Sequence, residues 1–119
     1  MSKREIVFEV KDWTQKRTVR LDKSTLLSHV LRFHYESAFV VDTLKQNFSR
    51  PICVIRNERH GTENAVYEIA TGGHPLLLVS IQFTQGIGKL AGKGNFIKTF
   101  YGIESTGIPT GPVLWGNRI

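Results

Sequence analysis

The sequence predicts an α+β domain in which one main helix packs on an antiparallel sheet of four or more strands. Two patterns predict this class: apolar residues recur at helical spacing over about 24–46, and four strand-like segments follow within about 51–103. The 119 residues contain no internal repeat or linker, so we expect residues 1–119 to form a single domain with one modest core.

The first two elements are predicted from the N-terminal third of the chain. Over about 4–22, "REIVFEV" and "RTVRL" alternate apolar and polar residues around the polar "KDWTQK", which indicates a hairpin. Asp22 or Ser24 then provides a suitable helix cap. Apolar residues recur at helical spacing from Leu27 to Leu44, so we expect the main helix over about 24–46.

The sheet is predicted from four segments after Arg50. They are "PICVIRN", "NAVYEIAT", "PLLLVSIQFT" and "NFIKTFYGI". The polar "ERHGTE" and the short "GGHP" are typical of tight connections between the first three segments. The C-terminal "ESTGIPTGPVLWGNRI" has so many Gly and Pro residues that we expect an irregular tail, anchored by Trp115.

The glycine-rich "GIGKLAGKG" between the third and fourth segments matches neither nucleotide-binding glycine motif. A P-loop needs a different glycine spacing and a Ser or Thr after its lysine, whereas Gly94 follows Lys93. The dinucleotide fingerprint fails because the glycines read GxGxxxG and precede a strand. We expect a long hairpin connection, which is either structural only or a nucleic-acid contact. In the second case Lys89 and Lys93, with Lys98 and Gln82 on the adjoining strands, would be the nucleic-acid-binding residues.

The net charge of +6, with a pI near 9.8, favours acidic partners, of which nucleic acid is the commonest. After Glu68 the only acidic residue is Glu104, so the C-terminal part is expected to carry an uncompensated positive field. The N-terminus lacks a secretory signal and no segment is apolar enough to span a bilayer, which predicts a cytoplasmic protein without a membrane partner. The single cysteine, Cys53, excludes an internal disulfide.

Side-chain alternation gathers polar residues on one face of the expected sheet. They are Arg56, Glu68, Gln82, Thr99 and Tyr101. Such a face is either the solvated side of a one-layer sheet or a chemical site. Cleavage of RNA by its own 2′-hydroxyl needs a base, an acid and donors for the phosphorane charge. Arg56 and Lys98 would stabilise that charge, and Glu68 or a histidine would act as base. Thr99 and Tyr101 would donate hydrogen bonds.

The histidines divide by position. On a regular helix His34 shares the apolar face with Leu31 and Ala38, as either a core histidine or a catalyst beside a cleft. His29 lies on the opposite, polar side and is expected to be solvated, so the pair does not share a face. No spacing of histidines, acids or cysteine matches a zinc site, and we expect neither a metal nor a cofactor.

Several segments and their order resemble the small phage and prophage nuclease-like domains of the barnase–EndoU–colicin–RelE superfamily. The resemblance covers roughly 17–103 and rests on "LLSHVLRFH", "RPICVI", "VYEI", "LLLVSI" and "FIKTFYGI". It implies a metal-independent ribonuclease, often a toxin or effector domain. By the same resemblance the active group would comprise His29 or His34, Arg56, and Thr99 with Tyr101.

The leading hypothesis is therefore a metal-independent endoribonuclease that cleaves tRNA or translating mRNA through a 2′,3′-cyclic phosphate. A cognate antitoxin or immunity protein is a second kind of expected partner. One alternative is a non-catalytic nucleic-acid-binding module that stacks bases on Trp13, Tyr101 or Trp115. Another is a protein-binding inhibitor or phage accessory protein that docks through an exposed sheet edge.

Overall fold

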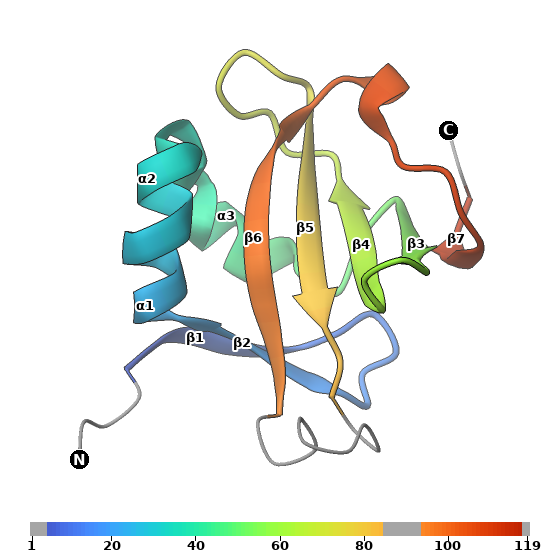
Figure 1. Ribbon diagram of the computed structural model, residues 1–119, viewed down its shortest axis with the longest axis horizontal. Helices are drawn as coiled ribbons and strands as arrows, with labels where there is room; N and C mark the ends of the chain where they lie inside the picture. The colour runs from blue at the N-terminus through green and yellow to red at the C-terminus, as the bar shows by residue number, and fades with distance from the viewer. Residues whose placement is uncertain (1–4, 85–93, 118–119) are drawn as a thin grey trace.

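The computed structural model describes residues 5–84 and 94–117. Within these ranges seven strands form one sheet in the order β1-β2-β6-β5-β4-β3-β7 (Figure 1). The strands are β1 (Ile6–Lys11), β2 (Thr18–Asp22), β3 (Cys53–Asn57), β4 (Thr62–Tyr67), β5 (Leu76–Gln82), β6 (Asn95–Ile103) and β7 (Val113–Gly116). The α+β class is confirmed, but the sheet is mixed rather than wholly antiparallel, because β2 and β6 run parallel.

The parallel pair is short, and this leaves most of one edge of β6 without a strand. β2 and β6 pair only at Val19 with Asn95 and at Arg20 with Phe96. From Phe96 onward β6 pairs with β5 on its other side. Figure 1 shows the first helical segment beside this edge of β6, and helical residues there contact the strand. The edge is thus covered by helix instead of by a further strand.

The expected continuous helix over 24–46 is wrong, because His34 divides it. The backbone of His34 has φ −141° and ψ 48°, outside the helical region. The first segment contains α1 (Lys23–Thr25), the π-helical turn η1 (Leu26–Val30) and α2 (Leu31–Phe33); the second contains the 3₁₀ helix η2 (Tyr35–Val40) and α3 (Val41–Asn47). The sequence "FHYESAFVV" around the break is rich in aromatic and β-branched residues, which are modest helix formers. None of the helices in the described ranges is long and apolar enough to cross a membrane.

Both faces of the sheet carry buried apolar clusters, so the face expected to be polar is apolar over much of β3, β4 and β5, while Thr99 and Tyr101 on β6 remain partly exposed. The larger cluster lies between the sheet, the N-terminal hairpin and the helices, and includes Val30, Leu44 and Phe48 from the helical part of the chain. A smaller cluster covers the opposite face, where Ile108 of the C-terminal segment packs on Leu76, Leu78 and their neighbours. This C-terminal segment therefore covers a second apolar face of the sheet, on β3, β4 and β5.

The C-terminal tail is not wholly irregular, because β7 pairs antiparallel with β3. Its glycines allow the backbones to approach closely. A Cβ on Gly116, which has φ +70°, would collide with the carbonyl oxygen of Ile52. Trp115 pairs with Val54 in this ladder but remains exposed, so backbone pairing rather than burial of the indole holds the tail. The glycines that suggested irregularity therefore permit an added edge strand.

Candidate active site

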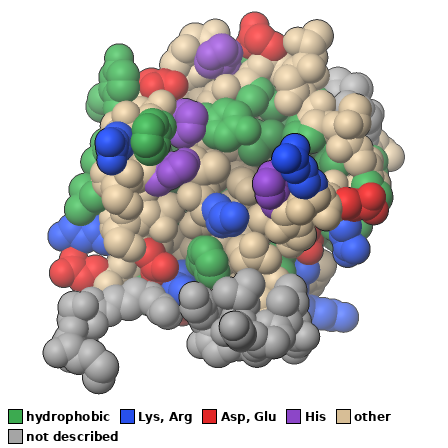
Figure 2. Space-filling model, viewed as in Figure 1, with side chains coloured by type: hydrophobic (Ala, Val, Ile, Leu, Met, Phe, Trp, Pro, Cys, Tyr) green, Lys and Arg blue, Asp and Glu red, His purple; other side chains and the backbone are tan. Residues whose placement is uncertain are grey.

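Four rings lie in sequence from the first helical segment to β6. The ring centroids of Phe33 and His29 are 5.3 Å apart, and those of His29 and His34 are 5.9 Å apart. The imidazole of His34 stacks on the phenol ring of Tyr101, with centroids 4.8 Å apart and planes at 30°. Figure 2 shows histidine side chains beside hydrophobic surface near the middle of this face. We call Phe33, His29, His34 and Tyr101 the ring ladder.

The helix irregularity explains why the two histidines meet. On a regular α-helix, residues five positions apart point about 140° away from each other. Here the Leu31 N–H donates to the Leu26 carbonyl oxygen, five residues back, which defines a wider π turn. The backbone then leaves helical geometry at His34 itself. The expectation that His29 and His34 do not share a face is therefore wrong, because it assumed an unbroken α-helix.

The electrostatics of His34 favour its neutral form. Partial burial lowers the pKa of His34, and the charge that His29 acquires on protonation lowers it further. The carboxylate of Glu36 acts in the opposite direction without restoring the ordinary pKa. An imidazole with a lowered pKa can accept a proton near neutral pH, which is the property a general base requires.

β6 carries two further candidates, Lys98 and Thr99, close in sequence to the ladder residue Tyr101. Thr99 and Tyr101 are two residues apart on the same face of the strand. The pairing between β5 and β6 skips Lys98, because Ser80 pairs with Thr99 while Ile81 pairs with Ile97. Lys98 is therefore the extra residue of a β-bulge, and its side chain is exposed. Ile97 therefore packs in the main core, on the face opposite Thr99. Simple alternation would have placed Ile97 and Thr99 on the same face.

The hydroxyl of Thr99 is unusual for a buried polar group. Its Oγ1 is inaccessible to solvent and has no hydrogen-bond partner among the described residues. An unsatisfied buried hydroxyl costs about 1–3 kcal/mol of stability. Such groups are rare in folded proteins, and this one lies two residues from the ladder residue Tyr101, on the same face of β6.

The other sequence candidates lie away from this group. Arg56 is on β3, three strand spacings or about 14 Å from β6, and has the parity of Val54 on the face of the larger core cluster. It lines a separate pocket with Asn57 and Pro109–Pro112. Glu68 lines another pocket, of about 460 Å³, beside Arg50 and α3. The expected single face that collects Arg56, Glu68 and Tyr101 is wrong, because Arg56 has the parity of the opposite face and Glu68 follows the end of β4 at Tyr67.

Three kinds of candidate remain: Gln82, the lysines of the glycine-rich stretch and the other two histidines. Gln82 is buried, and its amide nitrogen lies 3.3 Å from the carbonyl oxygen of Gly61, so it serves the sheet rather than an open surface. Lys89 and Lys93, together with most of the glycine-rich stretch, lie outside the described residues. Of the remaining histidines, His74 approaches Glu104 at 3.3 Å and His60 lies in an exposed turn. The described part of the chain holds no group of three or more residues arranged to bind a metal.

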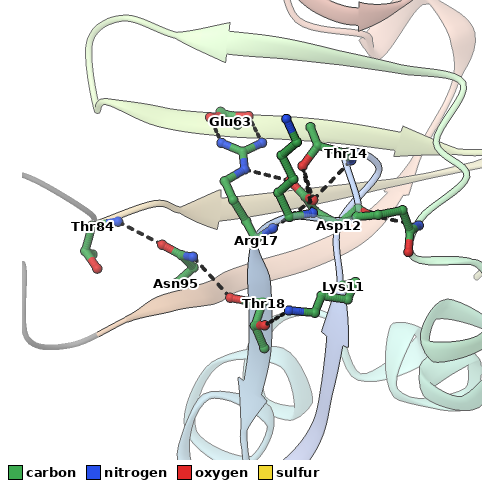
Figure 3. A network of polar contacts seen from close by, with 10 residues as sticks. Lys11, Asp12, Thr14, Arg17, Thr18, Glu63, Thr84 and Asn95 are labelled. Atoms are coloured by element: carbon green, nitrogen blue, oxygen red, sulfur yellow. Dashed lines mark hydrogen bonds and ion pairs between the residues drawn. The ribbon is translucent and has the colours of Figure 1, made fainter.

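A partly buried ionic network, which the sequence did not suggest, fixes the N-terminal hairpin to β4 (Figure 3). Asp12 accepts hydrogen bonds from the Thr14 hydroxyl and from Nε of Arg17, each at 2.6 Å. The two terminal nitrogens of Arg17 donate to Glu63 at 3.1 and 3.3 Å. Trp13 is buried beside this network, so it is not available to stack on a base. The only signal in the sequence was the charge pattern within "KDWTQKR".

The pKa of the Asp12 carboxyl reflects opposing influences in this network. Burial is the largest and would raise the pKa, because it disfavours the charged form. Hydrogen bonds from Thr14 and Arg17, together with the charge of Arg17, outweigh burial and lower the pKa. Asp12 is therefore a structural carboxylate whose ionised form the fold requires.

Comparisons of the chain with family models, with curated proteins and with solved structures find no significant match. The function is therefore inferred from the chemistry of the ring ladder. His29 and His34, the second with a lowered pKa and stacked on the phenol of Tyr101, form a pair suited to proton transfer. β6 adds the buried hydroxyl of Thr99 and the exposed ammonium of Lys98 within three residues of Tyr101.

Proposed function

We propose that this chain is a metal-independent endoribonuclease that cleaves RNA by attack of the 2′-hydroxyl on the adjacent phosphate. The observation that carries the proposal is the pairing of two imidazoles, His29 and His34, at 5.9 Å. Two proton transfers are needed in this reaction, one from the nucleophile and one to the leaving group. Two neighbouring histidines provide one group for each transfer.

In the proposed mechanism His34 acts as the base, because its lowered pKa keeps it neutral. His34 accepts the proton of the 2′-hydroxyl as the 2′-oxygen bonds to phosphorus. The bond from phosphorus to the 5′-oxygen breaks, and protonated His29 donates a proton to that oxygen. The products are a 2′,3′-cyclic phosphate and a 5′-hydroxyl, with no other reactant consumed.

Charge on the phosphorane is stabilised by donors from β6 in this proposal. Lys98 is exposed at the bulge and supplies an ammonium group. Thr99 supplies a hydroxyl without a partner in the described chain, and Tyr101 supplies a phenol under the His34 ring. Preorganised donors of this kind act most strongly where water is partly excluded. Arg56 and Glu68 have no part in the proposed chemistry, since they line other pockets.

The wider proposal includes the resemblance to the barnase–EndoU–colicin–RelE superfamily and the toxin or effector role that it implies. RNA in the cytoplasm, with tRNA and mRNA as candidate substrates, is the proposed target, in keeping with the net charge of +6. A cognate antitoxin or immunity protein is the proposed protein partner. An acidic surface on that protein would complement the positive charge of this chain.

The proposal is tested by incubating the protein with RNA in EDTA. The wild type is expected to cleave, and His34→Gln and His29→Gln are each expected to lose roughly 10²–10⁴-fold in rate, the usual contribution of a general acid or base. His60→Gln is the matched control, because His60 lies in an exposed turn outside the ring ladder. Full activity in both ladder variants, or cleavage only after a divalent metal is added, would contradict the proposal. Binding without cleavage would favour the non-catalytic module.

A further inference from the structure

Phe33 ends the ring ladder at the molecular surface. Its side chain is 59% exposed, although it is one of the largest apolar residues of the chain. One side of the ring approaches His29, with centroids 5.3 Å apart. The guanidinium carbon of Arg32 lies 5.2 Å from the same ring centroid. An exposed aromatic ring thus lies near both a candidate catalytic imidazole and a cation.

This placement follows from the same helix break that pairs the histidines. Phe33 is the last residue of α2, and the chain leaves helical geometry at the next position. The Phe33 ring consequently lies at the exposed end of the ring ladder instead of packing in the core. Folding gains little from an apolar ring that remains largely in water, so burial does not explain its position.

We propose that Phe33 is a stacking platform for a nucleobase of single-stranded RNA bound next to the cleaved phosphate. This inference rests on the proposed function, since it assigns the substrate class of that site. Every base has a π face, and aromatic rings next to cations are the usual platform for single strands. A base stacked on Phe33 leaves its own ribose and phosphate within reach of the neighbouring His29.

The geometry selects single-stranded RNA over a duplex. In an A-form duplex the bases are paired and stacked on each other, so none is free to lie on a protein ring. Arg32, beside Phe33, can place its planar guanidinium against the base or its cation against the phosphate. Because stacking reads only the face of the base, we expect tolerance of sequence at this position rather than strict preference.

The other rings considered for stacking fit less well. Trp13 is buried in the core. Trp115 lies on β7, at the end of the sheet far from β6. Tyr101 is already stacked under His34. Within the described ranges Phe33 is the largely exposed ring that also contacts a ladder histidine.

The test measures binding of a short single-stranded 2′-O-methyl RNA, which lacks the attacking hydroxyl and is not cleaved, by fluorescence anisotropy. We expect Phe33→Ala to raise Kd roughly 5- to 150-fold, the range typical for loss of one stacked base, and Phe33→Trp to restore binding. Phe39→Ala is the matched control, because Phe39 is 85% exposed and no ring contact involves it in the described chain. Its Kd should stay within about twofold of the wild type, as is usual for surface changes away from a binding site.

A second arm removes the base instead of the ring. An oligonucleotide with one abasic position at the stacked site should bind wild type and Phe33→Ala equally weakly, because the interaction partners are then already lost. Duplex RNA of the same sequence should bind both proteins alike. Unchanged affinity in Phe33→Ala, equal loss in Phe39→Ala, or no measurable binding of the single strand would overturn the inference.

The two proposals fail in different ways. If the wild type cleaves RNA in EDTA but Phe33→Ala binds the blocked strand normally, the stacking inference fails and the nuclease stands. If Phe33→Ala loses binding while the wild type never cleaves unmodified RNA, the nuclease fails and the stacking surface stands. Circular dichroism of Phe33→Ala checks that the fold is intact, which its exposed position predicts.

Discussion

His34 has a non-helical backbone between two helical segments, and its ring lies between His29 and Tyr101. The helix break and the position of this ring both depend on His34, the residue at which the helix is interrupted. The lowered pKa of His34 arises from partial burial first and from His29 second, with Glu36 opposing them. The proposed base is therefore tuned by neighbours that can be changed one at a time.

The pKa of His34 is predicted to move in opposite directions in two variants. His29→Gln removes a neighbouring positive charge and should raise the pKa of His34 toward its ordinary value. Glu36→Gln removes a carboxylate and should lower the pKa further. Titration of the ring protons by NMR measures both without any need for activity. Shifts of the same sign in the two variants would show that these contacts do not set the pKa.

Thr99→Val is predicted to stabilise the protein and to slow RNA cleavage. Valine has nearly the same shape as threonine, so the substitution removes an unsatisfied buried hydroxyl at little cost in packing. The expected gain is about 1 kcal/mol in the free energy of unfolding. The same change removes a proposed donor to the phosphorane, so the cleavage rate should fall. Urea unfolding and the RNA assay in EDTA are measured on one preparation. A stabilised variant with full activity would leave Thr99 without a catalytic part.

Among the elements, the N-terminal hairpin is joined to β4 by the side chain of Arg17. Arg17 bridges Asp12 in the turn to Glu63 on β4, and Cζ of Arg17 lies 3.7 Å from the ring centroid of Phe83. Without Arg17 the carboxylate of Asp12 would be buried and uncompensated, which is the costly way to break an ion pair. The hairpin matters for the site because β2 pairs with the start of β6.

Arg17→Met is accordingly predicted to destabilise the fold strongly. Loss of one partner of a fully buried pair costs about 3–5 kcal/mol, and partial exposure of Arg17 reduces the expected cost to roughly 2–4 kcal/mol. The control is Lys23→Met, which breaks an exposed pair with Glu5 and should cost at most about 1 kcal/mol. Urea unfolding at neutral pH measures both variants. Equal, small costs would mean that the network does not hold the hairpin.

The elements also show which parts of the fold the sequence could predict. Alternation in "REIVFEV" and in the strand segments has a period of two that survives in the structure, so the hairpin and β3 to β6 were predictable. The helix break was not predictable from the sequence. A π turn keeps roughly the same apolar positions as an α-helix, but it rotates the residues that follow it. The bulge at Lys98 likewise altered the parity of Ile97. The close approach of His29 and His34 depends on the irregular helix, not on the bulge.

At the scale of the whole molecule, strand order decided which candidates meet. The site combines the first helical segment with β6, which are far apart in sequence but adjacent where β2 leaves the edge of β6 unpaired (Figure 1). Arg56 and Glu68 fit the expected chemistry by residue type, yet β3 is three strands from β6. Parity within a strand is readable from the sequence, whereas the order of strands depends on packing across the whole domain. His29, His34, Thr99 and Tyr101 were named from sequence; Phe33 and the buried network were not.

The net charge of +6 and the ring ladder together support RNA as the substrate, and the form of the cleaved ends tests this most directly. An RNA oligonucleotide is cleaved in EDTA and its fragments are weighed by mass spectrometry, beside a copy with a 2′-deoxyribose at the cleaved position. The account predicts 2′,3′-cyclic phosphate and 5′-hydroxyl ends on the RNA, and no cut at the deoxy position. Fragments with 5′-phosphate ends, or cleavage of the deoxy copy, would contradict it.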